Sequence, residues 1–203
     1  MSDKKSLLRS LVVVVLFSLS GCMAMNGGPS RPLRPVEHVD LQRYMGGWFV
    51  IANIPYFAEK DCFDSVEGYA LLEDGRIDNR FACREKSFDA PMKPKLKTIA
   101  TVYDKKSNAE WRVPFFKVIQ AKYFVIDLDP EYQWAVIGHP SRRYGWIISR
   151  TRSLPEDTYR GILQRLRGQG YDDKRFVKVP QQEGAERTSA GAAIRTSRSV
   201  VAR

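Results

Sequence analysis

Short apolar runs and turn residues alternate along most of this chain, from residue 36 to residue 180. A turn recurs about every eight to twelve positions, which is typical of an all-β sandwich or barrel. The first run begins at Tyr44, where a glycine pair leads into a tryptophan. Alternation along a strand places Trp48, Val50 and Ala52 on one face. We expect this face to point into the core of a closed sheet.

Eight runs qualify as strands. They are residues 44–54, 65–72, 77–84, 96–103, 109–113, 122–128, 132–137 and 144–151. The hairpin signal Glu73-Asp74-Gly75 joins the second run to the third. Residues 89–95 contain two prolines and are expected to form a loop. Eight antiparallel strands can close into a barrel that holds one small ligand and leaves no exposed edge. We therefore predict an all-β fold, an eight-stranded antiparallel up-and-down barrel.

A helix is predicted after the eighth run. Ser153 supplies a cap residue, Pro155 stands near the first turn, and Gly168 ends the helix. Its apolar stripe consists of Tyr159, Ile162, Leu163 and Leu166. A helix with one apolar face must bury that face, and the outer wall of the barrel is the available surface. Residues 176–179 are predicted to form a short last strand.

The N-terminus, residues 1–21, has the pattern of a signal peptide. Lys4, Lys5 and Arg9 precede an apolar stretch that is too short to span a bilayer. This stretch ends in Leu19-Ser20-Gly21-Cys22, which resembles the bacterial lipobox. The resemblance implies cleavage before Cys22 and attachment of diacylglycerol to its thiol, a stable membrane anchor. Because methionine rather than aspartate follows the cysteine, it also implies sorting to the outer membrane.

The rest of the chain divides into three parts. Residues 22–35 are rich in Gly, Pro, Ser and Arg and are predicted to be a lipidated tether. Residues 36–180 form the barrel domain. Residues 181–203 lack aromatic side chains and are predicted to be a disordered basic tail. The formal charge is +10, but Lys and Arg form no dense stripe, so nucleic acid is not an expected partner.

Lipidation of Cys22 leaves two cysteines, Cys62 and Cys83, in an oxidising compartment. An even number of cysteines there favours a disulfide. The alternative is a pair of free thiols, with Cys83 as the nucleophile of an enzyme that modifies a bound lipid. No adjacent histidine is present to activate such a thiolate.

Little else in the sequence suggests catalysis. The two histidines, His38 and His139, are far apart in the chain, and His139 lies in a Gly-His-Pro turn. A histidine-rich metal site is therefore not predicted. The chain has no nucleophile elbow, phosphate loop or dinucleotide fingerprint. We expect neither an enzyme nor a cofactor.

Three features together resemble the lipocalin family. They are Gly46-x-Trp48 near the start of the first strand, Arg150 at the end of the eighth, and the single helix that follows. Leu128-Asp129-x-x-Tyr132 is a loose match to the second motif of that family. With its lipobox, the chain is similar to bacterial outer-membrane lipocalins related to apolipoprotein D. The resemblance implies that Trp48 packs across the closed floor of a calyx, with Arg150 over its indole.

The same resemblance implies an apolar ligand, for bacterial members a fatty acid or lysophospholipid held for storage, transport or scavenging. Inward alternation from Trp48 and Arg150 indicates a ligand site lined by Val50, Ala52, Trp146 and Ile148. The expected location is the outer membrane, lipid-anchored and facing the periplasm. A barrel filled by its own side chains, acting as an envelope interaction protein, is a further alternative. The sequence leaves the oligomeric state open.

Overall fold

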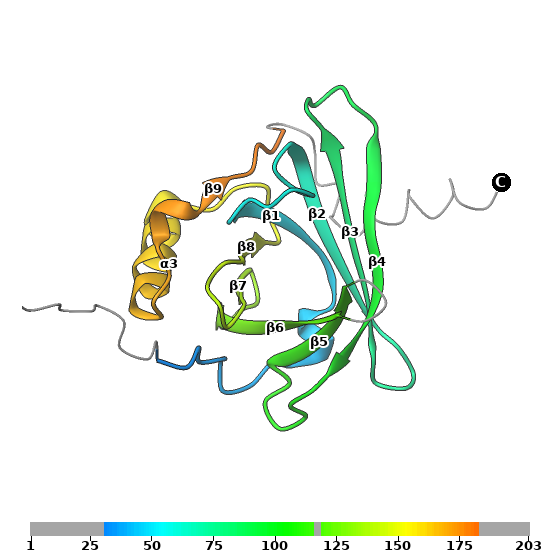
Figure 1. Ribbon diagram of the computed structural model, residues 1–203, viewed down its shortest axis with the longest axis vertical. Coiled ribbons are helices and arrows are strands. Elements are labelled where there is room, and N and C mark those ends of the chain that lie inside the picture. The colour runs from blue at the N-terminus through cyan, green and yellow to red at the C-terminus, as the bar shows by residue number, and fades with distance from the viewer. Residues whose placement is uncertain (1–30, 116–118, 183–203) are drawn as a thin grey trace, which may run out of the picture. The chain divides into compact units, whose positions relative to one another are not determined.

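The computed structural model describes residues 31–115 and 119–182. The predicted signal peptide, Cys22 and the tail from residue 183 lie outside the described residues. Eight antiparallel strands form a closed barrel, followed by one helix and a short ninth strand (Figure 1). The strands are β1 Gly46–Asn53, β2 Cys62–Leu71, β3 Ile77–Glu85, β4 Met92–Val102, β5 Glu110–Phe115, β6 Ile119–Leu128, β7 Trp134–Gly138, β8 Gly145–Ser149 and β9 Val177–Lys178. The helices are α2 Leu41–Tyr44, α3 Glu156–Gly168 and the 3₁₀ turn η1 Asp173–Arg175.

Strand β1 closes the barrel. Each strand from β2 to β7 pairs with the next one along the chain, and β1 pairs with both β8 and β2. In these pairs Trp48 lies opposite Glu67, and Val50 lies opposite Ile148. The predicted eight-stranded up-and-down barrel is therefore confirmed. Closure leaves the barrel strands without a free edge, and β9 adds to β1 from outside.

The hairpin between β2 and β3 forms where Glu73-Asp74-Gly75 predicted it. Gly75 has φ of +79°, a left-handed conformation that glycine adopts without the steric cost of a Cβ. The turn is closed by the N–H of Leu72, which donates to the carbonyl of Arg76 at 2.8 Å. The two strands then stay paired from Leu71 and Ile77 to Cys62 and Glu85.

Strand β4 is longer than the sequence predicted. It begins at Met92, inside the stretch expected to be a loop because of its prolines. Pro94 pairs with Ala82 next to an irregularity in the β3–β4 register. A proline lacks the N–H that a regular ladder needs, and an irregular position of this kind tolerates it.

A bulge in β1 overturns part of the predicted alternation. The register with β8 shifts between Val50 and Ala52, so that Ala52 pairs with Ile147 and Asn53 pairs with Trp146. Ala52 consequently joins the hydrophobic cluster outside the barrel rather than the one inside. The prediction that Ala52 faces inward is wrong, because an extra residue at a bulge exchanges the two faces of the strand beyond it.

Two hydrophobic clusters lie on the two sides of the barrel wall. The inner cluster contains large side chains from nearly every strand, with Trp48, Trp111 and Tyr44 fully buried. The outer cluster joins β1, β6, β7 and β8 to the apolar face of α3, through Tyr159, Ile162 and Leu166. The predicted docking of the helix on the outer wall is therefore confirmed, and the helix lies beside β1 and β8 (Figure 1).

The start of α3 differs from the prediction. The N-cap position is Pro155, and no side chain caps the first turn, so Ser153 does not act as the cap. Glu156 and Asp157 in the first turn, and Arg165 and Arg167 in the last, complement the helix dipole instead. The short helix α2, which the sequence did not predict, is capped by Asp40, whose carboxylate accepts from the N–H groups of Gln42 and Arg43.

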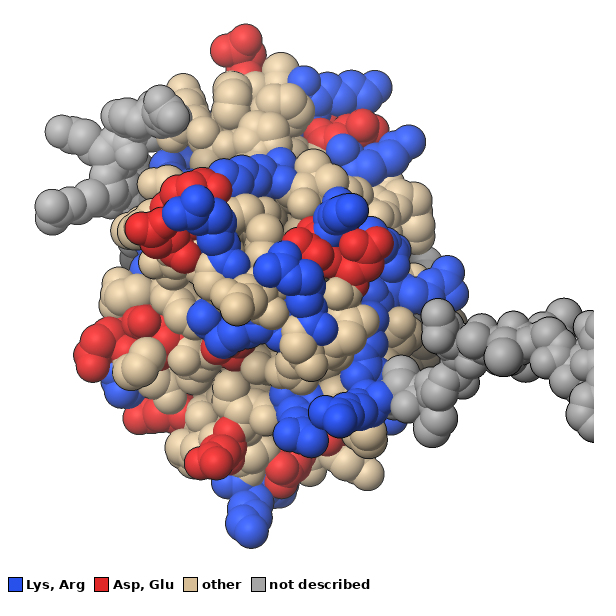
Figure 2. All heavy atoms as spheres, turned by 90° about the vertical axis from the view of Figure 1, so that its left-hand side faces the viewer, with Lys and Arg blue, Asp and Glu red and all other residues tan. Residues whose placement is uncertain are grey.

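Charges of both signs are interspersed on the face that carries α3 (Figure 2). Four ion pairs join cations and acids of this region: Arg160 with Asp157, Arg165 with Asp127, Arg167 with Asp173 and Lys178 with Glu156. In residues 31–115 and 119–182, no helix has the length and apolar character needed to cross a bilayer.

Candidate functional site

The closed end of the barrel is sealed by Trp48 and Arg150. The guanidinium carbon of Arg150 lies 3.5 Å from the centre of the Trp48 ring. Its nitrogens donate to the carbonyls of Gly47 at 2.9 Å and of Arg43, Tyr44 and Met45 at 2.8, 3.2 and 3.0 Å. Three of these carbonyls end the short helix α2, where a cation is favoured by the dipole. Burial lowers the pKa of Arg150 to about 10, so the side chain remains charged at neutral pH.

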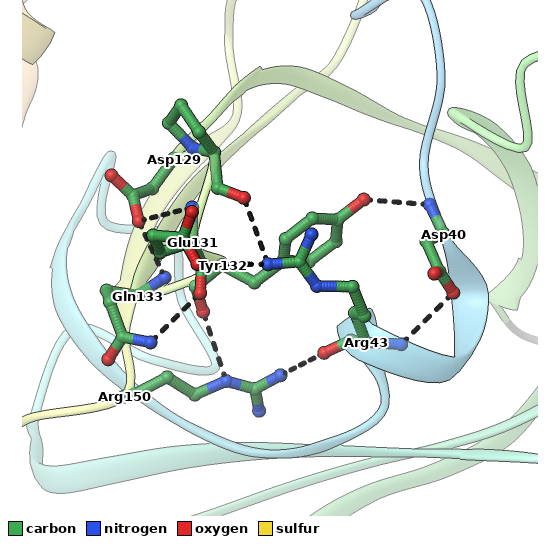
Figure 3. A network of polar contacts seen from close by, with 8 residues as sticks. Asp40, Arg43, Asp129, Glu131, Tyr132, Gln133 and Arg150 are labelled. Carbon is green, nitrogen blue, oxygen red and sulfur yellow. Dashed lines mark hydrogen bonds and ion pairs between the residues drawn. The ribbon is translucent and has the colours of Figure 1, made fainter.

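The turn before β7 completes this floor (Figure 3). Asp129 organises the turn by accepting from the N–H groups of Glu131 and Gln133. The hydroxyl of Tyr132 accepts from the N–H of Asp40 at 2.9 Å, and the guanidinium of Arg43 lies 4.2 Å from the Tyr132 ring centre. The structure thus brings together Gly46, Trp48 and Arg150 with the acidic turn, at the end of the barrel opposite its mouth.

Above the floor, four aromatic rings pack against one another. Trp111 and Tyr123 are stacked with centroids 4.7 Å apart, while Tyr44 and Tyr69 meet Trp111 edge-on at 5.4 and 5.6 Å. The Tyr123 hydroxyl lies 2.9 Å from those of both Tyr44 and Tyr69, which links the three into one hydrogen-bond chain. Buried hydroxyls need such partners. This lower part of the interior is closely packed.

A buried carboxyl group stands at the end of that chain. Tyr69 donates to Glu67, and Glu67 faces the interior between its cross-strand partners Trp48 and Phe81. Burial raises the pKa of Glu67 to about 8; the hydrogen bond from Tyr69 opposes this rise, and the neighbouring Glu59 adds to it. A carboxyl group with so high a pKa is largely protonated at pH 7.

A second buried carboxyl group, Glu59, lies in the loop between β1 and β2, at the end of the barrel opposite the Trp48–Arg150 floor, which we call the mouth. It accepts from the side-chain amide of Asn53 at 2.6 Å and from the indole N–H of Trp146 at 2.9 Å. Burial raises the pKa of Glu59, while the hydrogen bonds from Trp146, Asn53 and Tyr56 hold it down. Tyr56 also contacts Trp146 and Tyr144 edge-on, so Glu59 sits within an aromatic group at the mouth.

Cys62 and Cys83 form a disulfide, with Cα atoms 5.5 Å apart. Both cysteines belong to the inner cluster, where the bridge ties β2 to β3 near the mouth. Cys83 is therefore not the free thiol that a thiol-dependent enzyme would require. The predicted lipidation site, Cys22, lies outside the described residues.

The residues predicted to line a ligand site are only partly brought together. Val50 and Ile148 are adjacent partners in the inner cluster, and Trp146 packs against that cluster with part of its surface exposed. Ala52 lies on the outer wall. The sequence analysis missed Glu59, Glu67 and Asn79. The sequence is misleading for Glu67, because a charged residue beside the apolar Val66 is expected on the solvent face. Its inward direction follows only from its pairing with Trp48 and Phe81.

The comparisons with known proteins agree with this geometry. The family model of the lipocalin-like domain matches residues 39–181. Temperature-induced lipocalin-1 of Arabidopsis thaliana is 33% identical over 165 residues, covering 75% of this chain and 85% of that protein. Outer membrane lipoprotein Blc of Escherichia coli K12 is 29% identical over 153 residues, also covering 75% of this chain and 85% of that protein.

Solved structures show the same fold at lower identity. Insecticyanin from the tobacco hornworm Manduca sexta superposes with a TM-score of 0.61 at 15% identity, over 78% of this chain and 89% of that chain. None of these relatives carries the name of an enzyme, and the lipocalin barrel is a binding fold. From the matched domain, the closed barrel and its Trp48–Arg150 floor, we conclude that this chain belongs to the lipocalin family and is related to the Blc outer-membrane lipoproteins.

Proposed function

We propose that this protein is a membrane-anchored binding protein for a single-chain lipid, a fatty acid or lysophospholipid, in the cell envelope. The observation that carries the proposal is the asymmetry of the barrel interior. Its floor is filled by buried rings, whereas its upper wall is apolar and incompletely buried at Leu96, Trp146 and Tyr56. The ligand lies in this upper part, against Val50, Trp146 and Ile148, and above the packed rings.

The open end also presents apolar groups to solvent. Phe57 and Ile119 are 72% and 55% exposed, and Tyr144 lies beside Tyr56. Phe57 belongs to the β1–β2 loop and Ile119 to the start of β6, so they stand on different sides of the same rim. An exposed apolar rim around a barrel mouth gives a lipid chain a path from a membrane surface into the interior.

Ligand binding is tested on the mature protein after delipidation. Native mass spectrometry, with titration of fatty acids and lysophospholipids, should show one lipid bound per barrel at micromolar concentration. Trp146→Ala should weaken binding, while Trp134→Ala, which changes a tryptophan packed against the outer cluster, should not. If none of these lipids binds at micromolar concentration, the carrier function is ruled out and an interaction role with a filled barrel takes its place.

The anchor is tested separately. Cys22→Ser should remove the protein from the outer-membrane fraction and abolish incorporation of a labelled fatty acid, because cleavage and lipidation both depend on the thiol. The barrel of this variant should still bind lipid, because Cys22 precedes the domain. Retention of the variant in the outer membrane would show that the membrane association does not depend on this lipid.

A further inference from the structure

Strands β3 and β4 carry charged side chains on the inward face of the barrel, at its mouth. Directly opposed residues of neighbouring strands lie on the same face of a sheet. Glu85 lies opposite Cys62, and Lys93 lies opposite Cys83. Both cysteines belong to the inner cluster and form the disulfide near the mouth. Glu85 and Lys93 therefore border the entrance of the barrel rather than its outer wall.

A bulge in β4 brings a second lysine to the same carboxylate. Leu96 and Pro94 pair with consecutive residues of β3, so Lys95 between them is an extra residue. The Nζ of Lys95 contacts Oε1 of Glu85, while the Nζ of Lys93 lies 3.0 Å from Oε2. Two ammonium groups thus hold one carboxylate between them, one at each oxygen.

The carboxylate that these lysines hold can be exchanged for another. The side chain of Glu85 is 38% exposed, and those of Lys93 and Lys95 are 55% and 27% exposed. Ion pairs at exposed positions contribute little to stability, because water competes for both groups. Each ammonium group has three donors, and Glu85 occupies one of them in each lysine. Two cations facing one acid also leave one positive charge in excess.

The buried acid at the mouth belongs to a different group of side chains. Glu59 accepts from Asn53 of β1 and from Trp146 of β8. Strands β1 and β8 are neighbours, whereas β2 separates β1 from β3. The rim therefore has an acidic side at β1 and β8 and a cationic side at β3 and β4.

We propose that Lys93 and Lys95 bind the anionic head of the single-chain lipid, a carboxylate or a phosphate monoester, at the mouth. This inference rests on the proposed function, because it specifies the head group of the lipid that the barrel takes. Directly below the lysines, Leu96 packs on the inner cluster with part of its surface exposed, so that an acyl chain beside it continues into the apolar interior. The head takes donors of both ammonium groups in competition with Glu85.

The test compares three ligands with the same twelve-carbon chain: dodecanoate, dodecyl phosphate and dodecanol. Each is titrated into the delipidated mature protein below its micellar concentration, at pH 8, where the lysines and both anions are charged. Lys93→Met/Lys95→Met keeps most of the aliphatic stems and removes both charges. It should weaken the binding of dodecanoate about tenfold and change that of dodecanol less than about twofold. Raising the ionic strength to about 0.5 M should weaken the anions alone, because the lysines are exposed to salt.

Glu85→Gln should change the affinity in the opposite direction. It removes the competing carboxylate and keeps the size of the side chain, so dodecanoate should bind about threefold or more tightly. Lys105→Met/Lys106→Met is the matched control, because it removes the same two charges from the turn between β4 and β5, at the closed end. This control should leave the binding of dodecanoate unchanged. Thermal unfolding confirms that each variant is folded, and Glu85→Gln carries the test if Lys93→Met/Lys95→Met is not.

The outcomes separate this inference from the carrier function. The anion whose affinity depends more strongly on the two lysines identifies the head as a carboxylate or a phosphate. If neither Lys93→Met/Lys95→Met nor Glu85→Gln changes the affinity for the anions relative to dodecanol, the inference is wrong while the carrier function stands. It is also wrong if Lys105→Met/Lys106→Met weakens the anions equally, because net charge alone would then explain the effect. If none of the three ligands binds, the carrier function itself is overturned.

Discussion

Arg150 lies over the Trp48 ring and at the same time closes the C-terminal end of α2. Its guanidinium is 3.5 Å from the ring centre and donates to carbonyls of Arg43, Tyr44, Met45 and Gly47. The sequence resemblance implied the stacking alone. The additional hydrogen bonds make this side chain the link between the floor tryptophan, the helix before it and the last barrel strand.

Arg150→Ala should therefore destabilise the barrel by about 2–4 kcal/mol, since it removes the cation–π contact and several charge-assisted hydrogen bonds from a half-buried site. Urea unfolding followed by tryptophan fluorescence measures this loss. Arg150→Lys is the control: it keeps the charge but not the planar stacking or the fork of donors, so it should recover only part of the stability. Lipid affinity should change little, because Arg150 lies on the far side of the packed rings. A large loss of affinity without loss of stability would contradict a role in closing the floor.

Replacing Glu67 should change how stability depends on pH. Its pKa is raised from 4.5 to about 8 in the folded state, so the folded protein holds a proton that the unfolded chain releases above pH 4.5. The stability associated with this proton is fully present below pH 4.5 and is lost as the pH rises through about 8. Glu67→Gln, which never ionises, should match the wild type near pH 4.5 and exceed its stability at pH 9 by on the order of 5 kcal/mol.

Urea unfolding of the ligand-free wild type and of Glu67→Gln at pH 5, 7 and 9 measures this effect. Glu85→Gln, a change at an acid on the rim, should instead be least stable relative to the wild type at neutral and high pH, because Lys95 and Lys93 lower the pKa of Glu85. Parallel pH profiles for the wild type and Glu67→Gln would show that Glu67 is not held neutral by burial.

The disulfide should contribute about 3 kcal/mol to stability, because it closes a loop of 21 residues in the unfolded chain. The double variant Cys62→Ala/Cys83→Ala should unfold at correspondingly lower urea concentration and keep the same barrel by circular dichroism. A thiol assay on the denatured, unreduced mature protein should find no free thiol, and reduction should release two. Two thiols before reduction would contradict the bridge.

A side chain at Gly46 should destabilise the protein. Its φ is +101°, a region that residues with a Cβ rarely adopt, and a Cβ placed there would lie 3.4 Å from a guanidinium nitrogen of Arg150. Gly46→Ala should cost about 1–3 kcal/mol of unfolding free energy. Gly168→Ala is a suitable control, since no atom lies within 4 Å of a Cβ at that position. Equal stabilities for the two variants would show that the left-handed conformation of Gly46 is not required.

Much of the architecture follows from local patterns in the sequence. Alternating apolar residues and turn signals predicted the strands, whereas the closed end of the barrel was implied only by the family resemblance of Gly46-x-Trp48 and Arg150. The apolar stripe of α3 predicted its docking, because a one-sided helix has to bury that side. These features depend on residues close together in the chain or on one face of a single element, so a pattern can reveal them.

Only the tertiary structure shows which polar side chains face the interior of the barrel. A single bulge in β1 moves Ala52 outward and Asn53 inward, and no alternation rule locates a bulge in advance. Glu59 comes from a loop and Glu67 and Asn79 come from two strands, and the inward direction of the two strand residues follows only from the register of β2 against β1 and β3. The sequence by itself determined an eight-stranded barrel and, through its family resemblance, the position of Trp48 at the closed end. Only the closure of the barrel determined which polar side chains are buried, because burial depends on the register between strands that lie far apart in the chain.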